Sequence, residues 1–294
     1  MRQEALPVRI SPRSRAGAIF AGVALSGAAL ATLYAHRAEP RKVEVREVPL
    51  SLRRLGAAFD GYRIVQISDL HADRWMTPRR LRGLVERVNR LEPDLVAITG
   101  DLVTEAATGR EPELADALGG LRAPDGSVAV LGNYDYVAGE RVVRDLLHGA
   151  GVRELANDVY TVHRAGSMLH VAGVDDLWHR RARLDLVLRR MPGSGAAILL
   201  AHEPDFADVA AAAGRFDLQL SGHTHGGQVR LPLLGPVLRP RHGRIYHTGL
   251  YEVEEMIQYT NRGLGMFPPR LRLNCRPEIT AFTLNQPPDA RRRL

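Results

Sequence analysis

The sequence predicts an α/β fold with mixed β-sheets. In the first half of the chain, short apolar runs rich in β-branched residues alternate with amphipathic segments of helical period, and strand-like runs dominate the second half. The early runs are apolar at nearly every position, which indicates strands buried on both faces. With 294 residues and a hydrophobic fraction of 45%, the chain can form a core of ordinary size in one large domain or two small ones.

The individual elements follow from these patterns in chain order. Residues 36–50 are charged and strand-like, and they lead into buried strands at 62–67, 94–99 and 128–131. Between the first two of these, Thr77 is a helix N-cap and Pro78 occupies the first turn, and apolar residues then recur at helical spacing. Further helices are predicted at 112–121, 140–148, 183–190 and 204–213. Further strands are predicted at 169–174, 197–201, 218–221, 228–231, 245–248, 256–259 and 279–284, with a Pro- and Gly-rich surface loop at 231–244.

An uncharged run of 20 residues, 16–35, precedes the predicted domain. This length is enough to span a bilayer as a helix, and the four arginines before it favour a cytoplasmic N-terminus and an exported domain. The sequence therefore predicts an N-terminal transmembrane or signal-anchor helix. A cleaved signal peptide is one alternative, although Leu33-Tyr34-Ala35 is a poor small-x-small cleavage site. A buried core helix is the other.

The net charge of +7 is concentrated at the two ends of the chain. Residues 1–47 carry eight Arg or Lys against four Glu, and Arg291, Arg292 and Arg293 supply the rest, so residues 48–290 are formally neutral. A nucleic-acid groove should show excess positive charge within the folded domain, so nucleic acid is not expected as a partner and an anionic membrane surface is favoured. We therefore divide the chain into an N-terminal basic segment, membrane anchor and linker (1–47), a main domain (48–290) and a basic tail (291–294). The single cysteine, Cys275, excludes an internal disulfide and a cysteine-rich zinc site.

Side chains with oxygen and imidazole donors follow several of the predicted strands. Asp69 and Asp101 are separated by 32 residues, and so are Asp101 and Asn133. This interval is roughly the length of a β-α-β unit, which predicts that all three lie at the same end of one sheet. Hard divalent cations prefer oxygen ligands, and imidazole suits Mn, Fe, Zn and Co. The motifs are Asp69-Leu-His71, Gly100-Asp101, Gly132-Asn133-Tyr134-Asp135, Ala201-His202 and Gly222-His223-Thr224-His225.

Each carboxylate motif also has an ordinary structural explanation. Asp69 and His71 point to the same side if the backbone stays extended. A salt-bridged Asp beside a surface His would give the same sequence pattern. Asp101 fits a turn or an N-cap, although its two oxygens are also able to bridge two cations. Asn133 fits a turn or a neutral metal ligand. Asp135 fits a solvated loop carboxylate or a group that orients a neighbour.

The histidine motifs are harder to explain structurally. His202 after an apolar run could be an ordinary histidine at a strand end. His223 and His225, separated by one residue and flanked by glycines, are different, because glycine lets the backbone approach a ligand closely. A metal centre is therefore the prediction that explains the whole set.

Taken together, the motifs resemble the calcineurin-like metallophosphoesterase superfamily over residues 62–284. The strings SDLH, GNYDY, LLAHEPD, SGHTHGGQVRLP, NRGLG and CRPEIT are similar to its membrane-associated or exported bacterial branch. The resemblance implies a four-layer αββα sandwich of two mixed sheets flanked by helices. It also implies a location at a bacterial inner membrane, with the catalytic domain outside the cytoplasm.

The resemblance further implies a dinuclear hydrolase with two divalent ions drawn from Mn, Fe, Zn or Mg. One ion would lie on Asp69, His71 and His225, the other on Asn133, His202 and His223, with Asp101 bridging. A hydroxide between the ions would attack the phosphorus of a phosphomonoester or phosphodiester. The family places a histidine after the motif Asn, where this chain has Tyr134. A phenol with a pKa near 10 donates a hydrogen bond but is a poor general acid, so the source of the leaving-group proton is open, with Tyr134 and Asp135 as the catalytic candidates.

The implied substrate is a phosphorylated small molecule or a lipid near the membrane. Arg262 is a candidate phosphate contact because guanidinium matches phosphate bidentately, and a salt bridge explains it equally well. His179 could contact the substrate or be an ordinary surface residue. His242 and His247 could line the entrance of the predicted active site. An alternative activity is a diacylglucosamine diphosphate pyrophosphatase of lipid A synthesis, whose domain would face the cytoplasm. An alternative of another class is a non-catalytic metal-binding scaffold, against which the seven intact ligand positions argue.

Overall fold

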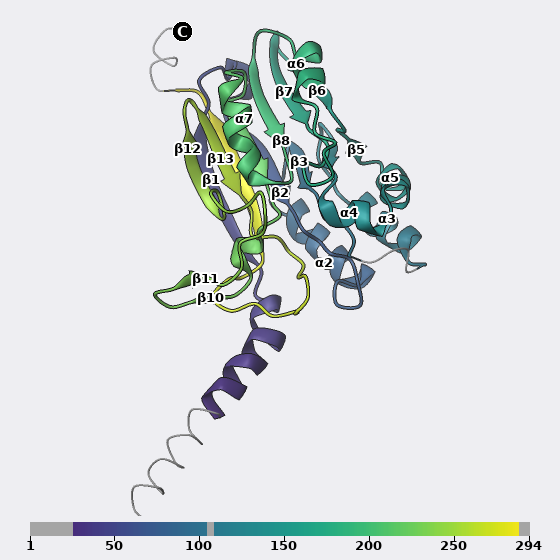
Figure 1. Cartoon of the computed structure of the whole chain (residues 1–294). Helices are drawn as coiled ribbons and strands as arrows, with labels where there is room; N and C mark the ends of the chain where they lie inside the picture. The colour runs from purple at the N-terminus through teal and green to yellow at the C-terminus, as the bar shows by residue number, and fades with distance from the viewer. Residues whose placement is uncertain (1–25, 105–108, 288–294) are drawn as a thin grey trace, which may run out of the picture.

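The computed structural model describes residues 26–104 and 109–287 (Figure 1). Two six-stranded sheets, of strand order β1-β14-β2-β3-β4-β5 and β12-β13-β9-β8-β7-β6, form the body. The strands of the first sheet are β1 (Glu44–Ser51), β14 (Glu278–Asn285), β2 (Tyr62–Ile67), β3 (Leu95–Thr99), β4 (Ser127–Val130) and β5 (Arg153–Glu154). Those of the second are β12 (Gly249–Val253), β13 (Met256–Thr260), β9 (Leu218–Ser221), β8 (Ala196–Leu200), β7 (Ser167–Gly173) and β6 (Asp158–Arg164). A two-stranded hairpin, β10 (Arg230–Leu231) and β11 (Gly235–Pro236), stands apart from both sheets.

Both sheets are mixed. In the first, β2 to β5 run parallel and β14 is antiparallel to β2; in the second, β7, β8, β9 and β13 run parallel and the edge strands β6 and β12 are antiparallel to their neighbours. The helices are α2 (Pro78–Asn89), α3 (Glu111–Gly119), α4 (Asn133–Ala138), α5 (Glu140–Gly149), α6 (Leu184–Arg190) and α7 (Ala207–Ala212), with single 3₁₀ turns at Glu39–Arg41, Ala57–Phe59, Pro204–Phe206 and His225–Gly227.

Three buried clusters define four layers. Side chains of α2, α3 and α5 pack on one face of the first sheet, side chains of both sheets pack between them, and α6 and α7 cover the outer face of the second sheet. The alternation is visible within β2, where Ile64 faces the second sheet and Val65 and Ile67 face the helices. The predicted α/β fold with two mixed sheets, layered αββα, is confirmed.

The helix α2 begins as its sequence predicts. The Thr77 hydroxyl accepts a hydrogen bond from the Arg80 N–H at 3.3 Å, Pro78 occupies the first turn, and the apolar face is buried. The loop between β2 and α2 starts at the carboxyl end of β2 and carries the first residues of the candidate site.

Two predicted strands are wrong. Residues 228–231 contribute only the two-residue β10, and residues 245–248 form no strand. The reason is local, because the Asp205 carboxylate accepts the backbone N–H groups of Arg244, Ile245 and Tyr246 and so holds this segment out of the ladder. The next strand, β12, begins after it.

At the N-terminus, residues 26–37 are helical, and β1 pairs with β14 over its whole length. Since β1 starts at Glu44, the sheet extends upstream of the predicted boundary between residues 47 and 48. Among the described residues, no helix has the length and apolar character that a bilayer crossing requires. Residues 16–25 of the predicted 16–35 segment lie outside the described residues, and so does the basic tail 291–294.

Candidate metal centre

All seven predicted ligands lie at the carboxyl ends of strands from the two sheets. The loops after β2 and β3 carry Asp69, His71 and Asp101, and Asn133 is the first residue of α4, which follows β4. His202 follows β8, and His223 and His225 follow β9. The strand ends of two neighbouring sheets therefore supply one set of side chains.

The first group of donor atoms belongs to Asp69, His71 and His225, all buried. The Nε2 atoms of His71 and His225 lie 2.9 Å apart, and His225 Nε2 lies 3.4 Å from an Asp69 oxygen. The other ring nitrogen of His71 lies 3.1 Å from the Thr104 hydroxyl, which fixes the ring. Two imidazole nitrogens and a carboxylate oxygen thus converge on one point.

The second group belongs to Asp101, His202 and His223. His202 Nε2 lies 3.2 Å from an Asp101 oxygen and 3.3 Å from His223 Nδ1. His202 Nδ1 donates to the Thr99 carbonyl at 2.7 Å, and His223 Nε2 donates to the Arg241 carbonyl at 2.8 Å. Because carbonyls only accept, these nitrogens carry protons, which leaves the facing nitrogens as the ones that would bind a metal through their lone pairs.

Asp101 connects the two groups. Its Oδ2 lies 3.2 Å from His202 Nε2 and 3.6 Å from His71 Nε2, while its Oδ1 accepts from the Tyr134 N–H at 2.8 Å. Beside it, Asn133 Oδ1 is buried and has no hydrogen-bond partner among the described residues. An orphaned amide oxygen of this kind is costly unless a cation or a donor satisfies it. The donor set therefore fits two divalent ions.

Burial sets the protonation of these side chains. It lowers the pKa of His71 and of His223 to about 4, and that of His225 well below its ordinary value, so these imidazoles are neutral at pH 7. Burial also raises the pKa of Asp69 to about 7, and it opposes ionisation of Asp101, whose pKa the facing imidazoles of His202 and His71 nevertheless hold at about 2. Burial disfavours the charged form of His202, but the facing Asp101 carboxylate raises the pKa of His202 well above its ordinary value. A cation bound here would take the place of the His202 proton and offset the unfavourable desolvation of the buried carboxylates.

Five of the seven predicted ligands adopt positive φ. The values are 49° at Asp69, 45° at His71, 53° at Asp101, 71° at His223 and 50° at His225. Residues other than glycine rarely adopt this left-handed conformation, and such strain concentrates at functional sites. The expectation of extended backbone from Asp69 to His71 is wrong, because two left-handed residues, rather than strand alternation, bring these side chains together.

Glycines allow the close approach of the loops, as expected from the sequence. A Cβ on Gly132 would lie 2.4 Å from Asp101 Oδ1 and 2.7 Å from His202 Nε2. One on Gly222 would lie 2.3 Å from Asp69 Oδ2. At both positions a side chain would occupy space that the donor atoms need.

Asp135 is fully buried rather than a solvated loop residue. Its Oδ1 accepts from the N–H groups of Leu102 and Val103, at 2.8 and 3.1 Å, and its Oδ2 accepts from Gly132 N at 2.9 Å. Asp135 therefore joins the loop after β3 to the start of α4. These contacts fit the orienting role that the sequence left open for Asp135.

A pocket of about 330 Å³ opens over the two groups. Of the predicted substrate-facing residues, Tyr134 and His179 line it, and the Tyr134 ring stands edge-on to His71 with centroids 4.9 Å apart. Burial and the Asp101 carboxylate raise the pKa of Tyr134, so the phenol is protonated at neutral pH. The pocket is lined by Asp101, Asn133, Tyr134, Val137, Trp178, His179, His223, His225, Pro240 and Phe267.

The structure does not bring Arg262 to this pocket. Its guanidinium pairs with the buried Glu278 and, at 3.2 Å, with Glu44, so the salt bridge, the alternative left open by the sequence, is what forms. His242 and His247 are not among the lining residues either, although the His242 ring lies 6.2 Å from that of Trp178.

Several residues of the site carry no motif signal. The apolar wall of Val137, Trp178 and Phe267 has no ligand atoms, so nothing in the sequence distinguishes it from core. Glu203 accepts the N–H groups of Leu177 and Trp178 at 3.2 and 3.1 Å and so positions that wall. Its place directly after His202 was the available clue.

Arg272 is also missed. Its fully buried guanidinium donates to the carbonyls of Arg262, Gly263, Gly265 and Cys275, and it lies 3.4 Å from His225 Nδ1. It holds together the loop that packs against the first group.

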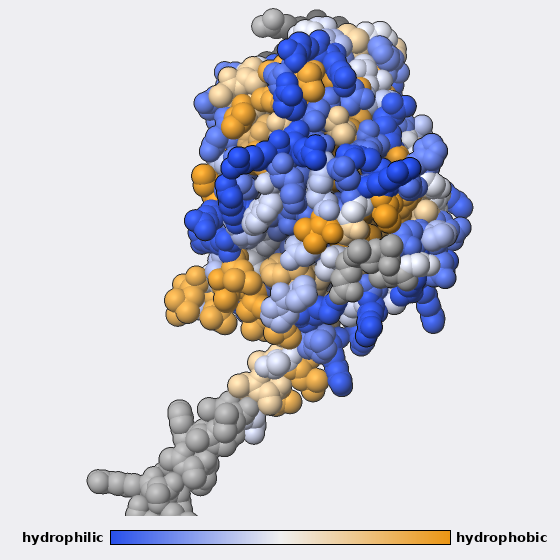
Figure 2. All heavy atoms as spheres, turned by 45° about the vertical axis from the view of Figure 1, so that its right-hand side comes forward, coloured by the Kyte–Doolittle hydropathy of each residue, from blue (hydrophilic) through white to orange (hydrophobic). Residues whose placement is uncertain are grey.

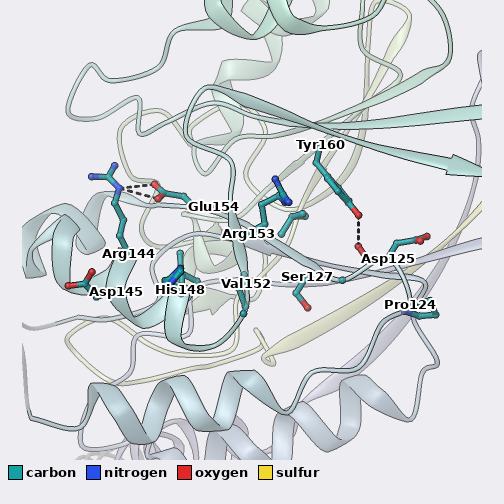
Figure 3. Close-up of a pocket in the computed structure, with 14 residues that line it drawn as sticks. Pro124, Asp125, Ser127, Arg144, Asp145, His148, Val152, Arg153, Glu154 and Tyr160 are labelled. Carbon is teal, nitrogen blue, oxygen red and sulfur yellow. Dashed lines mark hydrogen bonds and ion pairs between the residues drawn. The ribbon is translucent and has the colours of Figure 1, made fainter.

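A larger hollow lies elsewhere on the domain. It measures about 810 Å³ between the start of β4, α5 and the edge strands β5 and β6 (Figure 3). Among its lining residues, Arg144 pairs with Glu154 at 3.0 Å, and the Tyr160 hydroxyl donates to the Asp125 carbonyl at 3.2 Å. Neither His–Asp group lies in it, so the chemistry belongs to the smaller pocket.

Comparison with known proteins agrees with this geometry. Residues 62–227 match the family model described as calcineurin-like phosphoesterase. The chain is 36% identical over 271 residues to the uncharacterized metallophosphoesterase YkuE of Bacillus subtilis (strain 168), covering 91% of this chain and 94% of that one. It is 31% identical to phosphodiesterase YaeI of Escherichia coli (strain K12), covering 85% and 92%. It is 34% identical to the transmembrane protein with metallophosphoesterase domain of Danio rerio, covering 85% of this chain and 58% of that protein.

Proposed function

The chain belongs to the calcineurin-like phosphoesterase family, and on that premise we propose that it hydrolyses a phosphodiester or phosphomonoester with two divalent ions held at the described pocket. The first ion is assigned to Asp69, His71 and His225, and the second to Asn133, His202 and His223, with Asp101 shared between them. The chain is a hydrolase of the metallophosphoesterase class. Its substrate and the identity of its metals are the parts that we propose and test.

One observation carries the proposal. A single Asp101 oxygen faces imidazoles of both His–carboxylate groups, next to the orphaned Asn133 oxygen. Two divalent ions at these donors would lower the pKa of a water molecule and neutralise phosphoryl oxygens. The residues themselves supply four imidazoles, a shared carboxylate and a fixed geometry.

The leaving group is the second part of the proposal. Tyr134 lines the pocket beside Asp101 and His71, where its phenol is placed to donate a hydrogen bond to an ester oxygen. His179, whose Nδ1 is fixed by Asp176 at 2.7 Å, lines the opposite wall and is assigned to substrate contact. A phenol supports a substrate whose leaving oxygen needs little protonation, such as an acidic phosphodiester or a diphosphate.

We place the enzyme at a membrane, with the domain outside the cytoplasm. The uncharged run 16–35 and the arginines before it support this topology, as does the transmembrane relative from Danio rerio. The first domain boundary moves upstream of β1, and the tail 291–294 stays a separate segment. A reporter enzyme fused after Leu294 distinguishes the alternatives. Activity only in the cytoplasm would contradict export and favour a diphosphate hydrolase of lipid A synthesis.

The activity test uses the purified full chain. After removal of metals by a chelator, bis(p-nitrophenyl) phosphate should be stable, and hydrolysis should return on addition of Mn²⁺ or Zn²⁺. The same assay on an aryl monoester, a glycerophosphodiester and a lipid diphosphate ranks the substrate classes. Metal binding with no hydrolysis of any member would support the scaffold alternative and overturn the proposed activity.

A further inference from the structure

The hairpin β10–β11 and the loop after it expose an unusual number of apolar side chains. Leu233 at the tip is fully exposed, and Leu234 is 79% exposed. Figure 2 shows an orange patch at the lower left of the domain, where the hairpin projects. Isolated exposed leucines are normal, but a contiguous patch indicates an interaction surface. The patch consists of Leu231, Leu233, Leu234, Val237, Leu238 and Ile245.

The hairpin lies beside the described N-terminal helix. Both project from the same end of the molecule (Figure 1). One extended segment joins them, because Leu273 accepts from Arg230 N at 2.9 Å and the neighbouring Arg272 N donates to the Ala35 carbonyl at 2.9 Å. The helix also exposes Leu30 and Leu33 on this side of the domain. The two apolar surfaces therefore share one end of the fold.

The patch is flanked by exposed arginine side chains. Arg239, Arg241 and Arg244 are exposed, and residues 226–251 contain no Asp or Glu. Within the described ranges no carboxylate forms an ion pair with any of these three arginines. Apolar side chains next to unpaired arginines match the acyl region and the anionic headgroups of a bilayer.

We propose that the β10–β11 hairpin is a membrane-docking surface that inserts its leucines into an anionic phospholipid bilayer. A second copy of the chain is the weaker occupant, since a symmetric contact would bring the same arginines together. The described helix 26–37, which exposes Leu30 and Leu33, projects from the same end as the hairpin and would reach the same bilayer.

Docking would reach the metal centre directly. The carbonyl of Arg241 accepts from His223 Nε2, and Pro240 lines the pocket. A Cβ on Gly227 would fall 2.3 Å from Pro236 Cβ, so the hairpin packs on the loop that carries His223 and His225. The pocket then opens at the headgroup level, with Val137 and Trp178 at its rim. This consequence for the substrate, a lipid-linked phosphoester, rests on the proposed function, but the docking itself does not.

The test is a binding measurement on the full chain. The native Cys275 is buried, so a cysteine introduced by Leu234→Cys takes an NBD fluorophore selectively. Leu188→Cys on α6 is the matched control, because Leu188 is also an exposed leucine but lies on the helix layer far from the hairpin (Figure 1). With vesicles of phosphatidylcholine and phosphatidylglycerol, the label at 234 should shift its emission to the blue and be quenched by spin-labelled lipid. The label at 188 should do neither.

The outcomes separate the occupants. Equal emission at 234 and 188 in the presence of vesicles overturns the proposal. A blue shift at 234 that grows with protein concentration before lipid is added assigns the patch to a second copy instead. Quenching at 234 should weaken in pure phosphatidylcholine and in the Arg239→Glu/Arg244→Glu double variant, whose hydrolysis of a soluble aryl phosphodiester should be unchanged. Loss of that hydrolysis with quenching intact would count against the proposed function and not against docking.

Discussion

At the scale of single residues, Asp101 holds the site together. Its Oδ2 faces an imidazole from each group, and its Oδ1 is fixed by the Tyr134 N–H. Asp135, which is fully buried, accepts three backbone N–H groups and so fixes the loop after β3 and the start of α4. The reacting geometry is therefore set by one shared carboxylate and one buried positioning carboxylate.

Tyr134 determines which leaving groups the site accepts. In Tyr134→His, we expect hydrolysis of alkyl phosphodiesters, whose leaving groups are poor, to rise roughly tenfold or more, because imidazolium is a far better proton donor than phenol. The measurement is kcat/KM against leaving-group pKa, with Tyr134→Phe as the control that removes the hydroxyl alone. A dependence on leaving-group pKa that is equally steep in the wild type and in Tyr134→His would mean that position 134 does not face the leaving oxygen.

Residue type and spacing predicted a metal centre, because metal chemistry restricts ligands to few side chains, and the family resemblance implied which residues would bind each ion. The surroundings could not be predicted in the same way. Trp178 and Phe267 become pocket walls only through tertiary packing, and Arg262 is drawn away from the pocket by Glu278, which is distant in sequence. Asp135 was identified as an orienting group, but its burial depends on three N–H groups that only the folded loops bring together.

At the scale of elements, the site is a set of tight turns at strand ends. Gly132 closes the turn between β4 and α4 with no space for a side chain. In Gly132→Ala we expect metal affinity to fall roughly tenfold or more, because the new Cβ would displace Asp101 or His202. Gly83→Ala is the control, since Gly83 lies on the exposed face of α2 with nothing within 4 Å of its Cβ position. Metal titration of both variants makes the comparison, and equal affinities would contradict the tight turn.

His170 in β7 gives the second sheet a pH dependence of its own, away from the metal centre. Burial lowers its pKa below the ordinary 6.5, and its ring lies between the Thr161 hydroxyl and the Ser194 carbonyl, at 2.8 Å each. The unfolded chain therefore binds a proton at higher pH than the folded chain does. The stability is complete above pH 6.5 and is lost as the pH falls below it.

The expected result is a urea midpoint that falls from pH 7.5 to 5.5 in the wild type and falls less in His170→Gln. His163→Gln, at an exposed position of the adjacent strand, is the control and should keep the wild-type slope. Parallel slopes in all three chains would show that His170 does not titrate on unfolding.

The elements that could be predicted from sequence are those buried on both faces or strongly amphipathic. The strands predicted at 62–67 and 218–221 coincide with β2 and β9, and the apolar face of α2 is buried as expected. By contrast, β6 is a half-buried edge strand of mixed polarity, and α4 is too short to show a helical period, so neither was predicted. The conformation of the other segments depends on contacts between residues distant in sequence, such as those of Asp205 with residues 244–246.

At the scale of the whole molecule, the metal centre joins the two sheets. The first sheet provides the strands that precede four of the ligands, and the second sheet those that precede the other three. The two sets are Asp69, His71, Asp101 and Asn133, and His202, His223 and His225. The folded chain would bind ions at this site, and the unfolded chain has no equivalent site. Removing them should lower the stability of both sheets together.

We therefore expect a chelator to lower the thermal midpoint of the full chain, by roughly 5 to 10 °C for a site occupied at about 100 times its Kd. The reason is that each bound ion adds its binding free energy to the folded state alone. The check is differential scanning calorimetry with chelator, and again after Mn²⁺ is restored. An unchanged midpoint would contradict a metal site between the sheets.

The most direct test of the dinuclear centre is elemental analysis coupled to turnover, in the wild type and in Asp101→Asn. Asp116→Asn is the matched control, because Asp116 is an exposed carboxylate that pairs with Arg82 at 3.3 Å. We predict about two divalent ions per wild-type and control chain. In Asp101→Asn we predict a loss of bound metal together with a fall in kcat/KM of at least about 100-fold on bis(p-nitrophenyl) phosphate. Full metal content and an unchanged rate in Asp101→Asn would contradict the account.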